Sequence, residues 1–402
     1  MKVQINTNNS SKNTKKILAA TYYTFFVNGV IALILGAILP YMRDAYHLNY
    51  RTAGLLISFH SIGNLISSYV AGVLPMYVGR RKSILLFSSF GVIAFLLMIA
   101  TSNPITLIIL FTLTGLNRGA VSNFNNRAVN EIATGKGKAL NVLHSMFAIG
   151  AFISPFIALL FTRNNPDGWV YSVAVVSVLC LISFIVYAFI PIPGDNSKNT
   201  KQKSEKVETK TDWQFLKNKY FLAACGILFS YMCAEQAVNG LLVTYFIDSG
   251  IMSGSLAQTM ASLLWLVILF GRLFYAYLSN HIVNSKLLLS GAFGYLIFFI
   301  VLLLGRTTIS VVIGIIGVGF FMSGIYPTTI ASIGKIVKEN PMALSVILTT
   351  TGLGGIIMTA IIGAVADSIG IIGGMSLVII SVIATFAIII YNRYIYRNTD
   401  ET

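Results

Sequence analysis

A single carboxyl group lies deep inside a long apolar stretch of this 402-residue chain, that of Glu235. Burial disfavours the ionised form of a carboxyl group, so a glutamate in such a place can take up and release a proton. Gln236 is adjacent, and Asn239 lies one helical turn away on the same face. The alternatives are a fixed pair with an arginine or a neutral, hydrogen-bonded glutamate. We favour proton or substrate binding, because acids in such stretches are costly and usually functional.

A second polar face lies in the apolar stretch 105–130. At 3.6 residues per turn, Arg118 shares a helix face with Ser122, Asn125 and Asn126. Amide groups both donate hydrogen bonds to hydroxyls and accept them, so this face is suited to a hydroxylated solute. Hydrogen bonds between membrane helices are the alternative use of such residues. We expect the face to line a cavity.

Isolated polar or aromatic side chains complete the set of candidates. His144 is a second proton candidate, because histidine titrates near neutral pH, although a lone histidine in a helix bundle is more often a hydrogen-bonded packing residue. Trp265 offers a flat apolar ring that could stack on a sugar, or it could simply pack. His60 lies one turn from Asn64. The predicted substrate site comprises Asn28, Asn64, Arg118, Ser122, Asn125, Asn126, His144, Glu235, Gln236, Asn239 and Trp265, with Glu235 and His144 as proton carriers.

The elements that must hold these residues are membrane helices. The chain is 56% apolar and 10% charged, against roughly 25% charged residues in a soluble domain. A soluble enzyme, a disordered chain and a disulfide scaffold are excluded, and the three cysteines lie in apolar runs. Continuous rather than alternating apolar stretches of about 20 residues predict helices, not a barrel. The twelve predicted spans are 17–41, 52–75, 83–101, 105–130, 140–162, 169–191, 220–246, 256–281, 286–305, 308–333, 342–367 and 371–396.

Basic residues set the orientation of these spans. With the N-terminus inside, 21 of the 28 lysines and arginines fall in the inner segments and only 4 in the outer loops. This is the positive-inside bias of membrane proteins, and it places both termini in the cytoplasm. The net charge of +15 therefore faces anionic lipid, and we expect no nucleic-acid partner.

The chain divides into two halves. Residues 192–219 are polar and lack apolar periodicity, so we predict a cytoplasmic linker between six-helix bundles at 1–191 and 220–402. Short segments repeat faintly between the halves: Gly63-Asn64 corresponds to Gly271-Arg272, and Gly150-Ala151 to Gly354-Gly355. Two pseudo-symmetric bundles around a midplane site are typical of secondary transporters. No nucleotide-binding loop is present, so we expect no ATP drive and no cofactor or metal.

The loop after the second span resembles a motif of the major facilitator superfamily. Gly72, Gly79, Arg80 and Arg81 match its glycine and basic positions. Met76 stands at the position of the family's acidic residue, which places the charge latch of that loop in doubt here. The resemblance implies twelve helices in two bundles that alternate in access, with this loop and Gly271-Arg272 as gating elements.

Several segments further resemble the fucose permease family of fucose:proton symporters, which implies proton-coupled sugar transport. Acidic residues of that permease in its first and fourth spans have asparagines here, Asn28 among them, so substrate or coupling can differ. The matching segments lie at 143–155, 231–235, 265–272, 326–327 and 363–367.

The sequence thus predicts an all-α membrane protein that moves a small polar solute, sugar-like, together with protons. A drug or metabolite exporter of the same superfamily is the alternative. A membrane-embedded enzyme is disfavoured, because no nucleophile and base are arranged together. We expect a monomer of the cell membrane whose partners are its solute, protons and the lipid bilayer.

The topology makes a first testable prediction. A cysteine placed at Ser204, in the predicted cytoplasmic linker, should not react with a membrane-impermeant thiol reagent applied to intact cells. The same cysteine should react after the cells are permeabilised. Labelling in intact cells would overturn the twelve-span topology.

Overall fold

The computed structural model describes residues 7–132, 137–193 and 213–399, and helices account for most of them. The part of the predicted linker at 194–212 lies outside the described residues. The first half contains α1 (Thr7–Ala45), α2 (Tyr50–Val73), α3 (Pro75–Val78), α4 (Arg80–Met98), α5 (Pro104–Ile132), α6 (Gly137–Thr162) and α7 (Trp169–Phe189). The second half contains α8 (Lys219–Asp248), α9 (Gly254–Leu278), α10 (Asn284–Leu304), α11 (Thr308–Met322), α12 (Ile325–Ser332), α13 (Gly334–Glu339), α14 (Pro341–Ser376) and α15 (Val378–Thr399).

Twelve membrane passes follow from these helices. Ten stretches within the described chain are single passes, one of them formed by α11 and α12 together. The last stretch, Met342–Ile395, has 54 residues and would be about 80 Å long if straight, far more than a bilayer needs. It turns back at Ile369 and Gly370, whose backbone is not helical; Gly370 has a φ of 79°, which favours glycine. The predicted twelve-helix fold is confirmed, including the turn between 367 and 371.

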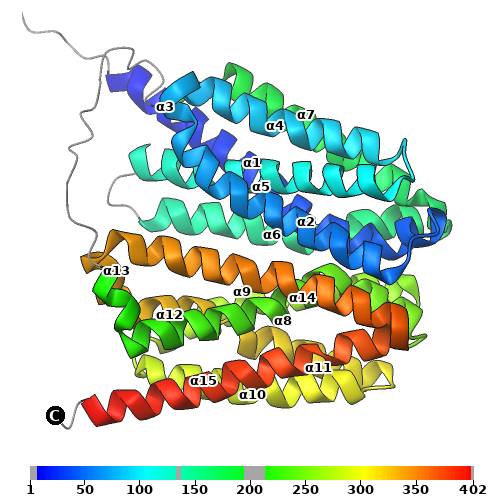
Figure 1. The fold of residues 1–402 in the computed structure, drawn as a ribbon. Coiled ribbons are helices and arrows are strands. Elements are labelled where there is room, and N and C mark those ends of the chain that lie inside the picture. The colour runs from blue at the N-terminus through cyan, green and yellow to red at the C-terminus, as the bar shows by residue number, and fades with distance from the viewer. Residues whose placement is uncertain (1–6, 133–136, 194–212, 400–402) are drawn as a thin grey trace, which may run out of the picture.

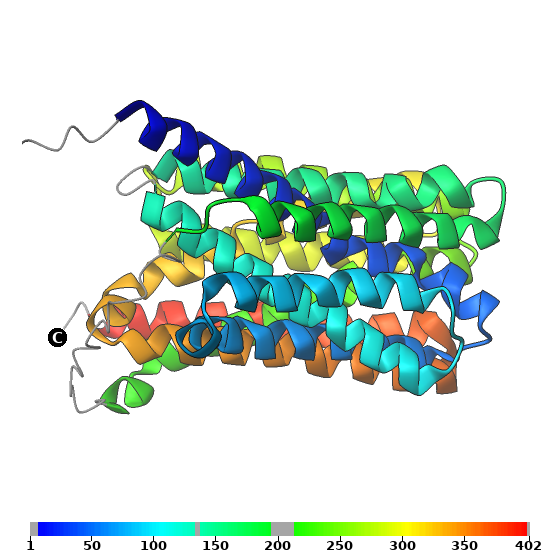
Figure 2. The same cartoon turned by 90° about the horizontal axis from the view of Figure 1, so that it is seen from above.

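The helices form two groups, drawn one above the other in Figure 1. In the first group α2 packs on α5, α1 on α6 and α4 on α7, and in the second α8 packs on α14 and α15. The groups meet where α2 contacts α14, α6 contacts α9 and α1 contacts α8. Both views place the start of α1 and the end of α15 at the same end of the bundle (Figures 1 and 2). We call this the inner end and the opposite end the outer end.

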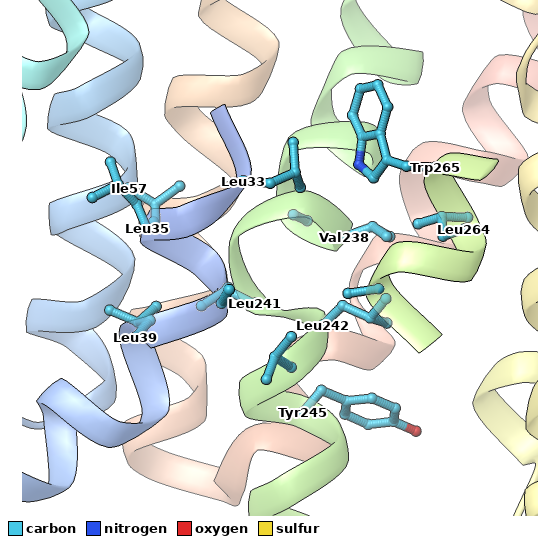
Figure 3. Packing of buried hydrophobic residues seen from close by; sticks show 14 of the residues in the cluster. Leu33, Leu35, Leu39, Ile57, Val238, Leu241, Leu242, Tyr245, Leu264 and Trp265 are labelled. Carbon is cyan, nitrogen blue, oxygen red and sulfur yellow. The ribbon is translucent and has the colours of Figure 1, made fainter. Parts of the chain in front are cut away.

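Close helix crossings hold the two groups together toward the outer end. A Cβ added to Gly54 of α2 would lie 2.4 Å from the carbonyl oxygen of Thr359 in α14, so only glycine allows this approach. Leu33 and Leu35 of α1 and Ile57 of α2 pack with Val238, Leu241 and Leu242 of α8 (Figure 3). All six side chains are buried. We call these six residues the outer seal.

The predicted linker is not polar throughout. Its final residues form a 3₁₀ helix, Trp213–Lys217, and the ring of Phe215 is buried against Phe221 at the start of α8. Apolar contact therefore anchors the end of the linker to the second half. The sequence predicted a polar linker through 219 but not this short helix, because two aromatic side chains among many polar ones give no periodic signal.

Candidate functional site

Glu235 lies within a group of tyrosines on the inner side of the outer seal. Its helix, α8, runs from the inner to the outer end, so Glu235 comes about one turn before Val238. The carboxyl group is buried and interacts electrostatically with Tyr231 of α8, Tyr295 of α10 and Tyr326 of α12. The Tyr295 hydroxyl is buried and makes no hydrogen bond within the described chain. Phenol groups from three helices thus lie near one acid.

Arg118 faces this acid from the other half of the molecule. Its guanidinium group, on α5, interacts electrostatically with Glu235 and lies 5.9 Å from the ring centre of Phe147 of α6. Among the described residues, no hydrogen bond or ion pair to Arg118 is formed, and the side chain is partly exposed. A cation and an acid therefore face each other across the two halves without direct contact.

His60 and Asn64 of α2 lie on the Arg118 side of the site. His60 Nδ1 is 2.8 Å from Thr114 Oγ1, while His60 Nε2 is buried without a partner among the described residues. Its ring is close enough to Arg118 to interact electrostatically with the guanidinium group. Asn64 is partly exposed. These residues provide further polar groups beside the arginine.

The polar face of α5 divides between two environments. Asn125 is fully buried; its Nδ2 donates to Thr24 Oγ1 at 2.9 Å, and its Oδ1 accepts from the Tyr187 hydroxyl at 3.1 Å. These bonds join α5 to α1 and α7, so Asn125 packs helices in this conformation instead of lining a cavity. Asn126, rotated by about 100° from it, is partly exposed and donates to the Ser122 carbonyl of its own helix at 2.8 Å.

Trp265 closes the site toward the outer seal. Its indole Nε1 donates to Asn239 Oδ1 at 3.3 Å, which connects α9 to α8, and its ring centre is 6.1 Å from that of Phe147 across the halves. Trp265 is 4% exposed, so little of its ring face is open for stacking here. Figure 3 shows the indole next to Val238 and Leu264.

Two more predicted residues lie near the centre of the bundle. Asn28 of α1 is buried, and its Oδ1 has no hydrogen-bond partner in the described chain. A buried acceptor without a partner is costly, so a ligand or water that donates to it would be stabilised. Gln236 is partly exposed and packs its Cγ close to Gly355 of α14.

Toward the inner end the polar residues become exposed. His144 of α6 is exposed, packs its edge on Phe25 at 5.5 Å between ring centres, and interacts electrostatically with Arg272 of α9. Arg272 is also exposed and interacts with Tyr231 and Tyr326. These two residues therefore connect the surroundings of Glu235 to the inner end.

The loop between α2 and α4 is fixed to its own half. Arg80 binds Glu131 of α5 at 2.7 Å, and Arg81 donates to the carbonyls of Ala188 and Ile190 at the end of α7. Gly79 has a backbone φ of 87°, a conformation that favours glycine. A Cβ added to Gly72 would have no neighbouring atom within 4 Å. Gly271, the other predicted gating glycine, packs against Ser323 of the second half.

The outer end carries a charged connection that sequence reasoning missed. Arg43 of α1 pairs with Asp248 of α8 and lies 4.4 Å from the ring centre of Tyr50. The backbone N–H of Tyr50 donates to Asp367 Oδ1 of α14 at 2.7 Å. In sequence these charges stand at span ends, where charge is ordinary, and Arg43 and Asp248 are 205 residues apart.

Among the described residues, no group of three or more His, Cys, Asp or Glu could hold a metal ion.

Comparison with known proteins agrees with this architecture. The family model described as Major Facilitator Superfamily matches residues 21–318. The glucose/galactose transporter of Brucella abortus biovar 1 (strain 9-941) is 27% identical over 380 residues, 90% of each chain. The arabinose-proton symporter of Bacillus subtilis (strain 168) is 29% identical over 168 residues, 40% of this chain and 36% of the symporter. The crystal structure of a variant of the nucleoside transporter NupG covers 95% of this chain and 99% of its own, with a TM-score of 0.78 and 14% identity.

Proposed function

Because this chain belongs to the major facilitator superfamily, we propose that it is a secondary active transporter that moves a sugar or sugar-like solute together with protons. The relatives named above, a glucose/galactose transporter and an arabinose-proton symporter, support this substrate class and this coupling. The membrane would be the cell membrane, with the inner end of the bundle in the cytoplasm. The basic residues at the inner end support this orientation.

The observation that carries the proposal is the separation of Arg118 and Glu235 across the two halves. A sugar presents hydroxyl groups that both donate and accept, so one solute can donate to the carboxylate and accept from the guanidinium. Hydrogen bonds to charged groups are the strong ones, contributing about 1.5–3 kcal/mol each. Such a solute would bind both halves at once and would favour the conformation in which they close around it.

Alternating access follows from the difference between the two ends. The outer seal and the Arg43–Asp248 pair close the outer end, whereas His144 and Arg272 are exposed toward the inner end. We infer that this conformation is inward-facing. Rocking of the halves would separate α1 from α8 at the outer end, as expected for two bundles around a central site.

We assign the carboxyl group of Glu235 as the group that carries the coupled proton. An acid with phenol hydroxyls nearby and with Arg118 facing it has partners in both protonation states, since a phenol can donate to a carboxylate and accept from a carboxylic acid. His144 is exposed on the inner side and would pass protons between Glu235 and the cytoplasm. The asparagine at position 28, where the fucose permease has an acid, leaves Glu235 as the buried acid of this site.

Ligand stabilisation of the purified protein tests the substrate class. Glucose, galactose, arabinose and fucose would be compared with nucleosides and common drugs, because a bound ligand raises the melting temperature by mass action. We expect stabilisation by one or more of the sugars, and none by the sugars in Arg118→Leu. Stabilisation by drugs alone would favour the exporter instead.

Opening of the outer end gives a further prediction. Asp248→Asn removes the charge that joins α8 to Arg43, so we expect the outward-facing population to increase. A loss of about 1–2 kcal/mol would raise it roughly 5- to 30-fold. The measurement is labelling of a cysteine at Ala37, which is buried in the outer half of α1, by an impermeant reagent from outside.

The matched control is Asp44→Asn. Asp44 also contacts Arg43, at 2.7 Å, but it belongs to the same helix and is exposed. Removing it should leave the labelling rate at Ala37 unchanged. Equal rates in the two variants would show that the Arg43–Asp248 pair does not keep the outer end closed.

A further inference from the structure

A cavity separate from the transport site opens at the inner end of the second half. It has a volume of about 440 Å³ and lies between α8, α10, α12, α13 and α15. Tyr220 of α8 lines it, 15 residues and therefore about 22 Å along the helix from Glu235. None of the residues assigned above to solute or proton binding borders it. The cavity is therefore not part of the proposed transport site.

One wall of this cavity is polar and positively charged. Arg393 of α15 points into it and makes no hydrogen bond or ion pair within the described chain. The neighbouring Asn392 also lines it, and its Oδ1 is buried without a hydrogen-bond partner among the described residues. A buried acceptor without a partner is costly, so a ligand that donates to it would be favoured.

The same wall contains the start of a long helix. α10 begins at Asn284, which lines the cavity together with Ser285, and Val283 supplies no side-chain cap. The first N–H groups of a helix have no partners inside it and favour an anion. No acidic side chain is among the residues that line the cavity, and Lys286 directly follows Ser285 in the chain. An anion is thus the natural occupant of this wall.

The opposite wall is apolar. Leu288 of α10, Ile333 after α12 and Ile389 of α15 are buried side chains that border the cavity, and Ile336 of α13 adds to them. A site with an anion-binding wall facing an apolar one suits a ligand with an anionic head and an apolar or small organic remainder. Basic pockets between membrane helices at the cytoplasmic side bind lipid head groups in this way.

We propose that this cavity binds a phosphate ester that carries a neighbouring hydroxyl or amine group. The phosphate accepts from Arg393 and from the first N–H groups of α10, and the hydroxyl or amine donates to Asn392 Oδ1. The phosphate belongs either to the head group of an inner-leaflet lipid or to a soluble phosphomonoester. Because the cavity contacts α8, α10 and α15, its occupancy would stabilise the second half as a unit.

The test compares three probes on the purified full-length protein in detergent by thermal stabilisation. Dioctanoyl-phosphatidylglycerol carries the phosphate, the hydroxyls and the chains; glycerol 3-phosphate carries only the head; dioctanoylglycerol carries only the chains. We expect stabilisation by the first or the second probe and none by the third. Stabilisation by the phospholipid alone identifies a lipid site, and equal stabilisation by glycerol 3-phosphate identifies a soluble ligand.

Two variants locate the binding. Arg393→Gln should weaken the response about tenfold, since a charge-assisted contact to phosphate is lost. Lys82→Gln, which removes an exposed cation of the first half, should not change it. Ala331→Trp places a large ring at the exposed rim of the cavity and should abolish the response even if Arg393→Gln folds poorly. An undiminished response in Ala331→Trp, or no response to any probe in the wild type, would overturn the proposal.

Discussion

Replacing Glu235 by glutamine should abolish accumulation of solute against its gradient while leaving solute exchange intact. Glutamine has the shape of the protonated acid and can still donate and accept hydrogen bonds, so the solute should still bind. It cannot release a proton, so a proton gradient can no longer drive net uptake. Exchange of solute across the membrane requires no net proton movement and should continue.

The assay uses two sets of proteoliposomes. One set carries a pH gradient and measures accumulation, and the other is preloaded with unlabelled solute and measures exchange. We expect at least a tenfold loss of accumulation in Glu235→Gln, with exchange within about twofold of the wild type, on the reasoning that only the charged state is removed. Accumulation that persists would assign proton transport to another group, with His144 as the next candidate.

The second large effect is expected at Arg118. Arg118→Leu removes the cation that faces Glu235 and leaves the acceptor oxygens of the solute without a partner. Loss of hydrogen bonds to a charged group costs about 1.5–3 kcal/mol, which corresponds to roughly 10- to 150-fold weaker binding. Because Arg118 has no hydrogen bond or ion pair in the described chain, its removal should not unfold the protein.

Controls on the same helix make this result specific. Arg127→Leu removes another arginine of α5, one that is paired with Glu131 at 2.9 Å near the inner end. It should leave solute affinity unchanged. Arg118→Lys keeps the charge but loses the planar fork of the guanidinium, so we expect an intermediate affinity. Wild-type affinity in Arg118→Leu would mean that the polar face of α5 serves packing, as Asn125 does.

The spans and the central charges could be predicted from sequence because both depend on the cost of polar groups in lipid. That cost makes apolar stretches long and makes Glu235 and Arg118 conspicuous within them. The same cost predicted the turn between the last two spans. At this turn Gly370 has a positive backbone φ, which favours glycine. The polar linker and the faint repeat between the halves predicted the two-bundle arrangement, which the resemblance to the superfamily also implies.

The surroundings of these charges could not be predicted, because they depend on which helix faces meet. Tyr295 belongs to a helix with no other signal, and tyrosine is ordinary in membrane helices, so nothing pointed to its place beside Glu235. Asn125 and Asn126 are equally polar, yet their side chains point about 100° apart, one toward α7 and one toward its own helix. Helical periodicity gives the face of a residue but not the neighbour that covers it.

Measuring the proton that accompanies the solute tests proton-coupled transport through Glu235 most directly. Wild-type proteoliposomes with a pH-sensitive dye inside would receive a pulse of glucose or galactose outside, without any imposed pH gradient. We predict that the lumen acidifies as the sugar enters, and that Glu235→Gln proteoliposomes preloaded with unlabelled sugar exchange it with no change in dye signal. Sugar entry in the wild type at constant lumen pH would contradict proton-coupled transport through Glu235.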